Sequence, residues 1–169
     1  NDLMNVAIKE LERISSAYSK LAVNLQINNL LIDDLTKEEL DMEGFINALC
    51  DDLNTANAMS EIYRVVKESN QSLRCNPIDY KKIKKCFYTL KSMFDVLGFE
   101  IDYPHLTNDD ILLYNQYIEA KAKKDFQTSD SLRKTLIERK ILWDRIMDEI
   151  IIKNIKKSEW GQFGGIGHI

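Results

Sequence analysis

The residues best suited to chemistry in this sequence are cations that gather around two aromatic side chains after residue 119. Lysine and arginine attract phosphate groups and aromatic rings stack on unpaired bases, so this composition is typical of a surface that binds single-stranded nucleic acid. The alternative is structural: the cations complement the negative end of a helix, and the aromatic ring lies in the core. Spacing alone leaves both interpretations open. The cations are Lys121, Lys123, Lys124, Arg133, Lys134, Arg139 and Lys140, and the aromatic residues are Phe126 and Trp143.

The net charge of the whole chain, −4 over 169 residues, at first counts against a nucleic-acid partner. The charges are, however, segregated along the sequence. Residues 1–70 hold 6 Lys/Arg and 13 Asp/Glu, whereas residues 119–157 hold 11 Lys/Arg and 7 Asp/Glu. A basic region therefore exists despite the acidic total. A second group of lysines, Lys81, Lys82, Lys84 and Lys85, is as consistent with a solvated helix face as with a phosphate track.

No set of residues is arranged for catalysis within this chain. The adjacent carboxylates of Asp51 and Asp52 point in different directions from a helix end and are more typical of caps. His105 follows Pro104 in a connector and is expected at the surface. The glycine-rich end of the chain lacks the strand before it and the helix after it that a phosphate-binding loop requires.

The three cysteines, Cys50, Cys75 and Cys86, accompany two histidines and have no CxxC spacing. This set is too small for a zinc site or a disulfide framework, so we expect buried or half-buried thiols in a reducing cytoplasm. The sequence has no apolar run of 18 residues, so no membrane partner is expected. It starts with Asn1 rather than an initiator Met, from which we expect a piece of a larger protein.

The scarcity of turn formers, six glycines and two prolines, favours helices over a many-stranded sandwich or barrel. We expect a mainly α protein, with an antiparallel helical bundle over residues 1–98 and a small α+β C-terminal domain over residues 107–157. Apolar residues at helical spacing predict a first helix over residues 3–25. Further starts and ends of the bundle helices are predicted at a capping box of Thr36 and Glu39, at Asn54 or Thr55, at Pro77 and at Gly98.

In the second domain, Thr107 is predicted to cap a helix, and a short helix is predicted over residues 127–139. Residues 141–146 and 149–153 are short β-branched runs, which predict a β-hairpin that turns at Met147 and Asp148. Because this turn has no Gly or Asn to adopt positive φ, a continuous helix over residues 146–156 competes with the hairpin. Residues 158–169 hold four of the six glycines and are expected to form a flexible tail.

Three stretches, in the expected order, resemble the C-terminal part of the cysteinyl-tRNA synthetases. The first is the opening helix, residues 3–21. The second, residues 45–58, is similar to the D-D-x-N-T segment of that family's helical-bundle (DALR) domain. The third, residues 120–133, is similar to the A-x-x-x-K-D/N-F-x-x-A-D-x-L/I-R segment of its anticodon-recognition region, with Ser129 where alanine is usual. Their order and separation over residues 3–145 make the joint resemblance specific.

The resemblance implies the tRNA-holding arm of an ATP-dependent ligase that activates cysteine as cysteinyl-adenylate and transfers it to tRNA. The catalytic domain of that family carries HIGH and KMSKS signatures and a zinc ion, and this sequence has none of these signatures. No catalytic residue is therefore carried over, and no metal or cofactor is expected in this chain. ATP and zinc are expected in a catalytic domain of the same polypeptide. The resemblance also implies that residues 1–98 pack along the tRNA and that residues from about 107 onward read a GCA anticodon.

On this resemblance, Arg133 donates to a base or a phosphate, and Asp130 orients Arg133 or accepts a hydrogen bond from an exocyclic amine. Asp144 falls where the family has an acidic residue and is given the same accepting role. The aromatic residue that stacks on a base stays open between Trp143 and Trp160, since the family closes with a different turn. The expected tRNA-binding residues are Lys121, Lys123, Lys124, Asp130, Arg133, Lys134, Trp143 and Asp144.

Two alternatives accompany this hypothesis. The first is a helical protein-interaction module in which an acidic face over residues 33–52 docks a partner and the basic region is merely solvated. Charge swaps at Asp33, Asp34, Glu38 and Glu39 test it. The second is a free-standing synthetase paralogue that has lost catalysis, which the sequence encoded upstream of Asn1 distinguishes from a full synthetase.

Overall fold

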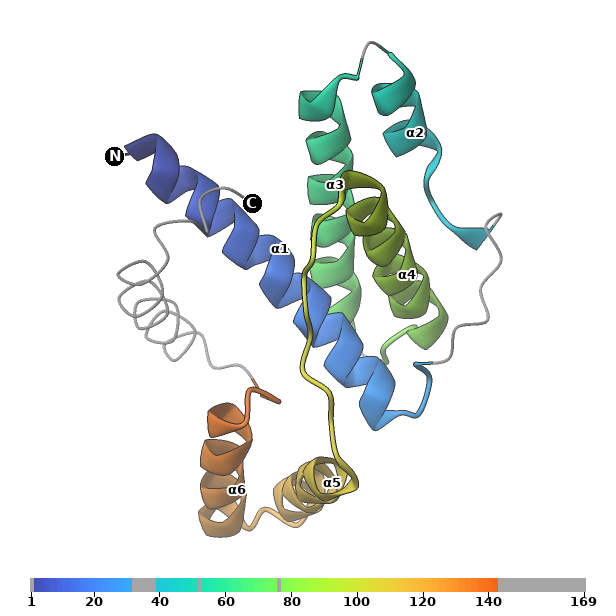
Figure 1. Cartoon of the computed structure of the whole chain (residues 1–169). Helices are drawn as coiled ribbons and strands as arrows, with labels where there is room; N and C mark the ends of the chain where they lie inside the picture. Colours follow the sequence, from blue (N-terminus) through green and yellow to red (C-terminus); the bar gives the residue numbers. More distant parts are fainter. Residues whose placement is uncertain (1, 32–38, 52, 76, 143–169) are drawn as a thin grey trace. The chain divides into compact units, whose positions relative to one another are not determined.

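The computed structural model describes residues 2–31, 39–51, 53–75 and 77–142, and over these residues its secondary structure consists of helices joined by turns and loops, with no strand (Figure 1). The mainly α class is therefore confirmed. The chain divides into two compact units, residues 9–103 and residues 1–8 with 104–169. The helices are α1 (Asp2–Ile27), α2 (Glu43–Cys50), α3 (Thr55–Arg74), α4 (Tyr80–Leu97), α5 (Asn108–Ala122) and α6 (Phe126–Glu138).

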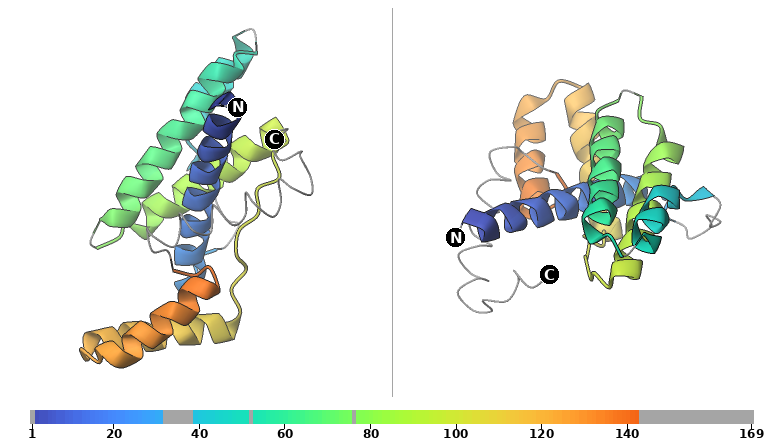
Figure 2. Two further views of the ribbon diagram at one scale, coloured as in Figure 1. Left: turned by 90° about the vertical axis from the view of Figure 1, so that its left-hand side faces the viewer. Right: turned by 90° about the horizontal axis from the view of Figure 1, so that it is seen from above.

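The unit of residues 9–103, called the bundle unit below, buries one apolar face of each of its four helices in a common core. Helices α3 and α4 lie side by side, α2 lies beside α3, and α1 runs obliquely across the pair (Figures 1 and 2). Removing these apolar side chains from water is the main driving force for the packing. The fully buried side chains include Ile14, Leu21, Leu25, Phe45, Ile62, Ile83, Phe87, Leu90 and Met93.

A cluster of aromatic rings lies at the centre of the bundle unit. The ring of Tyr18 on α1 stacks on that of Phe87 on α4, with 4.7 Å between the ring centroids. Phe94 and Tyr103 meet Tyr18 edge to face, at centroid distances of 5.1 Å and 5.7 Å. Burial raises the pKa of the Tyr18 hydroxyl, and the neighbouring Tyr103 and Asp95 raise it further. Stacked and edge-to-face pairs are the favoured aromatic geometries, so this cluster ties α1 to α4.

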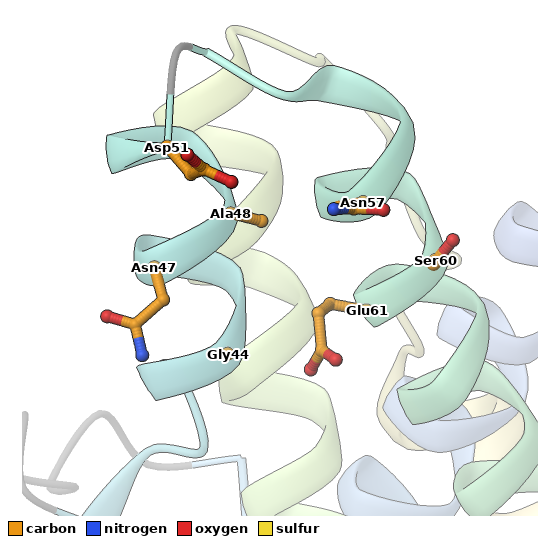
Figure 3. Close-up of a pocket in the computed structure, with 7 residues that line it drawn as sticks. All are labelled: Gly44, Asn47, Ala48, Asp51, Asn57, Ser60 and Glu61. Atoms are coloured by element: carbon orange, nitrogen blue, oxygen red, sulfur yellow. The ribbon is translucent and has the colours of Figure 1, made fainter.

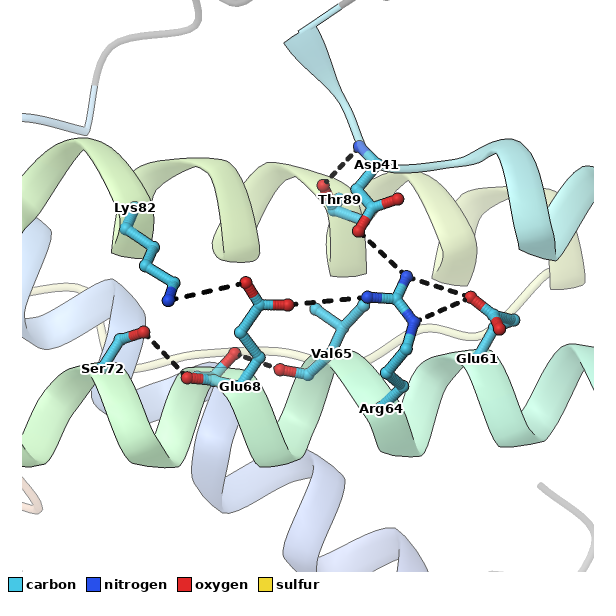
Figure 4. Close-up of polar contacts among 9 residues, drawn as sticks. Asp41, Glu61, Arg64, Val65, Glu68, Ser72, Lys82 and Thr89 are labelled. Carbon is cyan, nitrogen blue, oxygen red and sulfur yellow. Dashed lines mark hydrogen bonds and ion pairs between the residues drawn. The ribbon is translucent and has the colours of Figure 1, made fainter.

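A polar network on the surface joins α3 to the segment that precedes α2 (Figure 4). The Arg64 guanidinium lies 2.9 Å from the Asp41 carboxylate, 3.0 Å from that of Glu61 and 3.5 Å from that of Glu68. The Asp41 N–H donates to the Thr89 hydroxyl on α4 at 3.2 Å. Because one guanidinium is shared among three partly exposed carboxylates, the network orders this connection more than it adds stability.

The helix ends confirm two of the predicted boundaries. The Asn54 side chain accepts from the Asn57 N–H at 3.1 Å and caps α3, and Gly98 ends α4 with φ of 71°. A left-handed residue at this place lets the last carbonyls of the helix find partners, and glycine adopts it without steric cost.

Two other predicted helix starts are corrected by the structure. Helix α2 begins at Glu43, so Leu40 lies before it, and Met42 at its N-cap makes no side-chain cap hydrogen bond. Helix α4 begins at Tyr80 rather than near Pro77, because the Asp79 carboxylate accepts from the Lys82 N–H at 3.3 Å and proline offers no acceptor side chain. Thr36 lies outside the described residues.

Helices α5 and α6 form a helical hairpin joined by the turn 123–125 (Figure 1). The interior of this helical hairpin holds Ala120, Leu136, Ile137 and Ile141, all buried. The small side chain of Ser129, where alanine is usual in the resembling segment, is also buried. Its hydroxyl donates to the Phe126 carbonyl at 3.2 Å, which satisfies the one polar group that the substitution adds.

The predicted β-hairpin is not supported where the structure describes it. Residues 141–142 form a bend, because the N–H of Ile141 donates to the Leu136 carbonyl at 2.9 Å and that of Leu142 donates to the same oxygen at 3.3 Å. These residues therefore close the end of α6, and burial of Ile141 inside the helical hairpin accounts for their apolar character. The rest of the predicted β-hairpin, the competing helix and the glycine-rich tail lie outside the described residues.

The cysteines differ in exposure. Cys86 is buried, as predicted, and burial raises the pKa of its thiol. Cys50 and Cys75 are exposed, in contrast to the expectation, because both lie at helix ends rather than on an inner face. In the part of the chain that the structure describes, no helix is long and apolar enough to cross a membrane.

Candidate nucleic-acid interface

The turn between α5 and α6 brings three of the predicted lysines to one end of the helical hairpin. Lys124 has φ of 56°, its N–H donates to the Lys121 carbonyl at 3.2 Å, and the Asp125 N–H donates to the Ala120 carbonyl at 2.9 Å. This is the Schellman pattern that ends many helices, here with lysine at the left-handed position. The Asp125 carboxylate then accepts from the Thr128 N–H at 3.3 Å and starts α6. Backbone geometry thus places Lys121, Lys123 and Lys124 together.

Each of these lysines is exposed, and two have neighbours that hold them loosely. Lys123 Nζ lies 2.6 Å from Glu119 Oε1, and this contact lowers the pKa of Glu119 and raises that of Lys123. Lys121 Nζ lies 5.9 Å from the centroid of the Tyr117 ring. Surface contacts of this kind are weak, so the ammonium groups can turn toward a phosphate at small cost.

An exposed stripe runs along α6 from this turn. Phe126, Asp130, Arg133 and Lys134 occupy positions i, i+4, i+7 and i+8 and are all exposed; they are called the α6 stripe below. Residues at these spacings share one helix face, so the stripe joins three predicted site residues to an aromatic ring. The structural alternative, in which Phe126 lies in the core, is wrong: its side chain is 65% exposed.

The other end of the helical hairpin is fastened by a capping box and two ion pairs. The Thr107 hydroxyl accepts from the Asp110 N–H at 3.2 Å, and the Asp110 carboxylate accepts from the Thr107 N–H at 3.0 Å, so the predicted cap is confirmed. Arg139 at the end of α6 lies 2.8 Å from Asp110 and 3.1 Å from Asp109. Arg139 is therefore occupied in closing the helical hairpin rather than in the cationic turn.

These contacts predict a pH dependence. The hydrogen bond from the Thr107 backbone, and then Arg139, hold the pKa of Asp110 below its usual range. A lowered folded-state pKa stabilises the native state above about pH 4, and this contribution is lost as the pH falls through the folded-state value. We expect urea unfolding, followed by circular dichroism of the helices, to show this loss below about pH 4.

Replacing Asp110 by Asn is expected to lower the free energy of unfolding by about 1 kcal/mol at pH 6. The variant should also lose less stability than the wild type when the pH falls below about 4. Asp109→Asn is the matched control, because Asp109 touches the same guanidinium but is far more exposed. If Asp110→Asn loses as much stability below pH 4 as the wild type does, Asp110 is not the source of the pH dependence.

A second candidate, an open hollow of about 360 Å³, lies between α2 and α3 in the bundle unit (Figure 3). The Glu61 side chain points into the space between the helices, and a Cβ on Gly44 would lie 2.8 Å from its Oε2 atom. Glycine at position 44 therefore gives this carboxylate its room. With Asp51 at its rim, the hollow carries acidic groups that repel phosphate. Its lining residues are Gly44, Asn47, Ala48, Asp51, Asn57, Ser60 and Glu61.

Comparison with known proteins places these features in a family. The family model described as the DALR domain matches residues 44–102. Over 146 residues the chain is 34% identical to proteins named cysteine–tRNA ligase from Bacillus thuringiensis (strain Al Hakam), Bacillus cereus (strain AH820) and Bacillus anthracis (strain CDC 684 / NRRL 3495). The match covers 83% of this chain and 31% of each relative.

The chain is thus similar to the C-terminal part of the cysteine–tRNA ligases. The resemblance inferred from the three sequence stretches is confirmed. The chain spans about a third of the length of the relatives it matches. No solved structure matches the chain significantly.

Six of the eight residues predicted to bind tRNA lie in the described helical hairpin, and Trp143 and Asp144 lie outside the described residues. Lys121, Lys123 and Lys124 gather at the turn, whereas Asp130, Arg133 and Lys134 follow α6. The N-cap at Asp125 was not predicted from the sequence. Its signal is the residue type, because aspartate before a helix commonly accepts a hydrogen bond from the N–H three residues later, here that of Thr128. His105 is exposed, as expected.

The left-handed conformation of Lys124 offers a test that separates stability from binding. Non-glycine residues in this conformation cost about 1 kcal/mol, so Lys124→Gly should stabilise the helical hairpin by that amount while removing a cation. We expect this variant to unfold at a higher urea concentration than the wild type and to bind RNA more weakly. Lys140→Gly is the matched control: φ of Lys140 is 61°, and it lies at the opposite end of the hairpin. It should gain the same stability with unchanged binding, and equal losses of binding would contradict the placement of the interface.

Proposed function

We propose that this chain is the tRNA-binding arm of a cysteine–tRNA ligase and that its helical hairpin reads a GCA anticodon. The observation that carries the proposal is that the segment resembling the anticodon-recognition region forms the exposed lysine turn and the α6 stripe. The similarity to proteins named cysteine–tRNA ligase supplies the amino acid and hence the anticodon.

The geometry suits unpaired, splayed bases better than a duplex. An anticodon loop offers Watson–Crick edges together with closely spaced phosphates, and proteins recognise it by stacking and by hydrogen bonds to those edges. In the proposed complex the lysines of the turn attract phosphates, Arg133 donates its planar fork to a base or phosphate, and Asp130 accepts from an exocyclic amine. Lys134 adds a further phosphate contact.

The bundle unit is proposed to lie along the inner side of the tRNA. Its sequence carries most of the acidic residues, and the hollow between α2 and α3 is acidic as well. Sequence-independent attraction of phosphate therefore falls to the helical hairpin, which keeps the anticodon end of the tRNA on the reading surface.

The chemical step is proposed to occur in a catalytic domain of the same polypeptide, which supplies the sites for ATP and zinc. Among the described residues, no group of three or more His, Cys, Asp and Glu side chains is placed to hold a metal ion. These residues do not fit the zinc site that the family implies. A cytoplasmic location remains an expectation from the sequence.

The proposal predicts a preference for one anticodon and an affinity that falls with salt. We expect the 169-residue chain to bind a tRNA transcript with a GCA anticodon more tightly than the same transcript with a changed anticodon, measured by filter binding at low salt. If the chain makes three phosphate contacts, its affinity for either transcript should fall roughly 20- to 40-fold as the salt concentration rises from 50 to 200 mM. Equal binding of the two transcripts would refute anticodon recognition.

The two alternatives make different predictions. In a protein-interaction module, charge swaps at Asp33, Asp34, Glu38 and Glu39 would abolish a partner while leaving tRNA binding intact; the first three of these residues lie outside the described part of the chain. A non-catalytic paralogue would retain tRNA binding but lack HIGH and KMSKS signatures in the sequence encoded upstream.

A further inference from the structure

The first two turns of α1 expose an apolar stripe. Leu3 is 82% exposed, Val6 57% and Met4 45%, and Ala7 beside them is exposed as well; these four residues are called the α1 stripe below. Leu3 precedes Leu21 by 18 residues, which are five helical turns, so it lies on the face of α1 that the bundle core buries farther along the helix. A contiguous exposed apolar face of this kind marks a contact surface.

The α1 stripe belongs to the same compact unit as the helical hairpin, residues 1–8 with 104–169. Among the described residues, this unit holds six of the ten exposed large apolar side chains but only five of the 25 buried apolar residues. A helix gains stability by packing its apolar face on another element, so the described helices leave part of the apolar surface of this unit without cover. The six exposed residues are Leu3, Met4, Val6, Leu112, Ile118 and Phe126.

The sequence that follows α6 carries a complementary pattern. In residues 146–156, where the sequence allows a continuous helix, apolar residues recur at helical spacing and charged residues fall between them. A helix of this length is marginal by itself in water, so it needs an apolar surface to pack on. The apolar residues are Ile146, Met147, Ile150, Ile151 and Ile155.

We propose that residues 146–156 form an amphipathic helix that packs antiparallel on the α1 stripe. The two segments belong to one unit, and the covalent tether gives residues 146–156 an effective concentration that a separate partner lacks. Charge sets the orientation: Asp2 precedes Lys9 by seven residues, and Asp148 precedes Lys156 by eight, so an antiparallel pair brings opposite charges together at both ends. The contact fastens the end of the helical hairpin to the start of α1 and requires no bound RNA.

The test is hydrogen exchange of the full 169-residue chain, followed by mass spectrometry. In the wild type, the amides of residues 146–156 are expected to exchange more slowly than an unstructured chain does. Val6→Gln should speed their exchange roughly 10- to 150-fold, the effect on an equilibrium of losing the burial of one large apolar side chain, and Leu3→Gln should do the same. Glutamine is a good helix former, so α1 itself should remain helical in both variants.

Val96→Gln is the matched control, because Val96 is 58% exposed, against 57% for Val6, and lies on α4 in the bundle unit. It should leave the exchange of residues 146–156 unchanged, and equal exchange of the α3 amides in all variants should show that the bundle stays folded. Unprotected amides at 146–156 in the wild type, or protection that Val6→Gln and Leu3→Gln leave intact, would overturn the proposal. Protection that disappears on dilution, together with a dimer in analytical ultracentrifugation, would assign the α1 stripe to a second copy of the chain and overturn it as well.

Discussion

Replacing Phe87 by alanine is expected to destabilise the bundle unit by about 3–5 kcal/mol. Phe87 is buried against Tyr18 on α1 and also contacts Tyr88 and Tyr103, so truncation leaves a cavity at the point where α1 meets α4. A domain of this size has a total stability of roughly 5–15 kcal/mol, so the loss is a large part of it. The measurement is urea unfolding followed by circular dichroism, with hydrogen exchange of the α4 amides to locate the change.

Val96→Ala on the same helix is the control, because Val96 is 58% exposed and its truncation should cost less than about 0.5 kcal/mol. Phe87→Leu should fall between the two variants, since it keeps most of the volume but loses the stacked ring. A cost for Phe87→Ala as small as that of Val96→Ala would show that the aromatic cluster does not hold α1 on the bundle.

Arg133→Ala is expected to weaken binding of the GCA transcript roughly 10- to 100-fold, the range for loss of an arginine contact to a base. Arg133 is exposed in the α6 stripe, and its loss opens no cavity, so the variant should melt close to the wild type. Filter binding with the two transcripts measures the effect, and the preference for GCA should decrease together with affinity.

Arg133→Lys distinguishes the two roles proposed for this residue. A base contact needs the planar fork and should be lost with lysine, whereas a phosphate contact needs only the charge and should be largely kept. Lys140→Gly removes one cation from the far end of the helical hairpin and should leave binding unchanged. If Arg133→Ala and Lys140→Gly weaken binding equally, the effect is one of net charge, and Arg133 has no specific place in the interface.

Local patterns were sufficient for most helices of this protein. Caps act over three residues, so Asn54 and the Thr107 capping box were predictable from the sequence, and Gly98 was predictable as the residue that tolerates positive φ. The helical spacing of apolar residues likewise placed α1, because periodicity of 3.6 residues is needed to bury one face of a helix.

The errors arose where a local pattern competed with burial. The β-branched run that starts at Ile141 is typical of a strand, yet the structure uses Ile141 to close α6 and to fill the interior of the helical hairpin. The N-terminal boundary of α4 shifted from Pro77 to Tyr80 because the Asp79 carboxylate satisfies a free amide there. Propensity records an average over many environments, and a specific hydrogen bond or buried contact outweighs it.

The sequence by itself determined the helical class, the resemblance to cysteine–tRNA ligases and the set of cations proposed for the interface, since residue types and spacings carry all three. Only the tertiary structure decided which of those cations lie together. Arg139 is drawn away to Asp109 and Asp110, whereas the turn gathers the lysines beside Phe126. It also decided that Phe126 is exposed and not core, because burial depends on which helix face packs against α5, and neighbours along the chain do not specify that face.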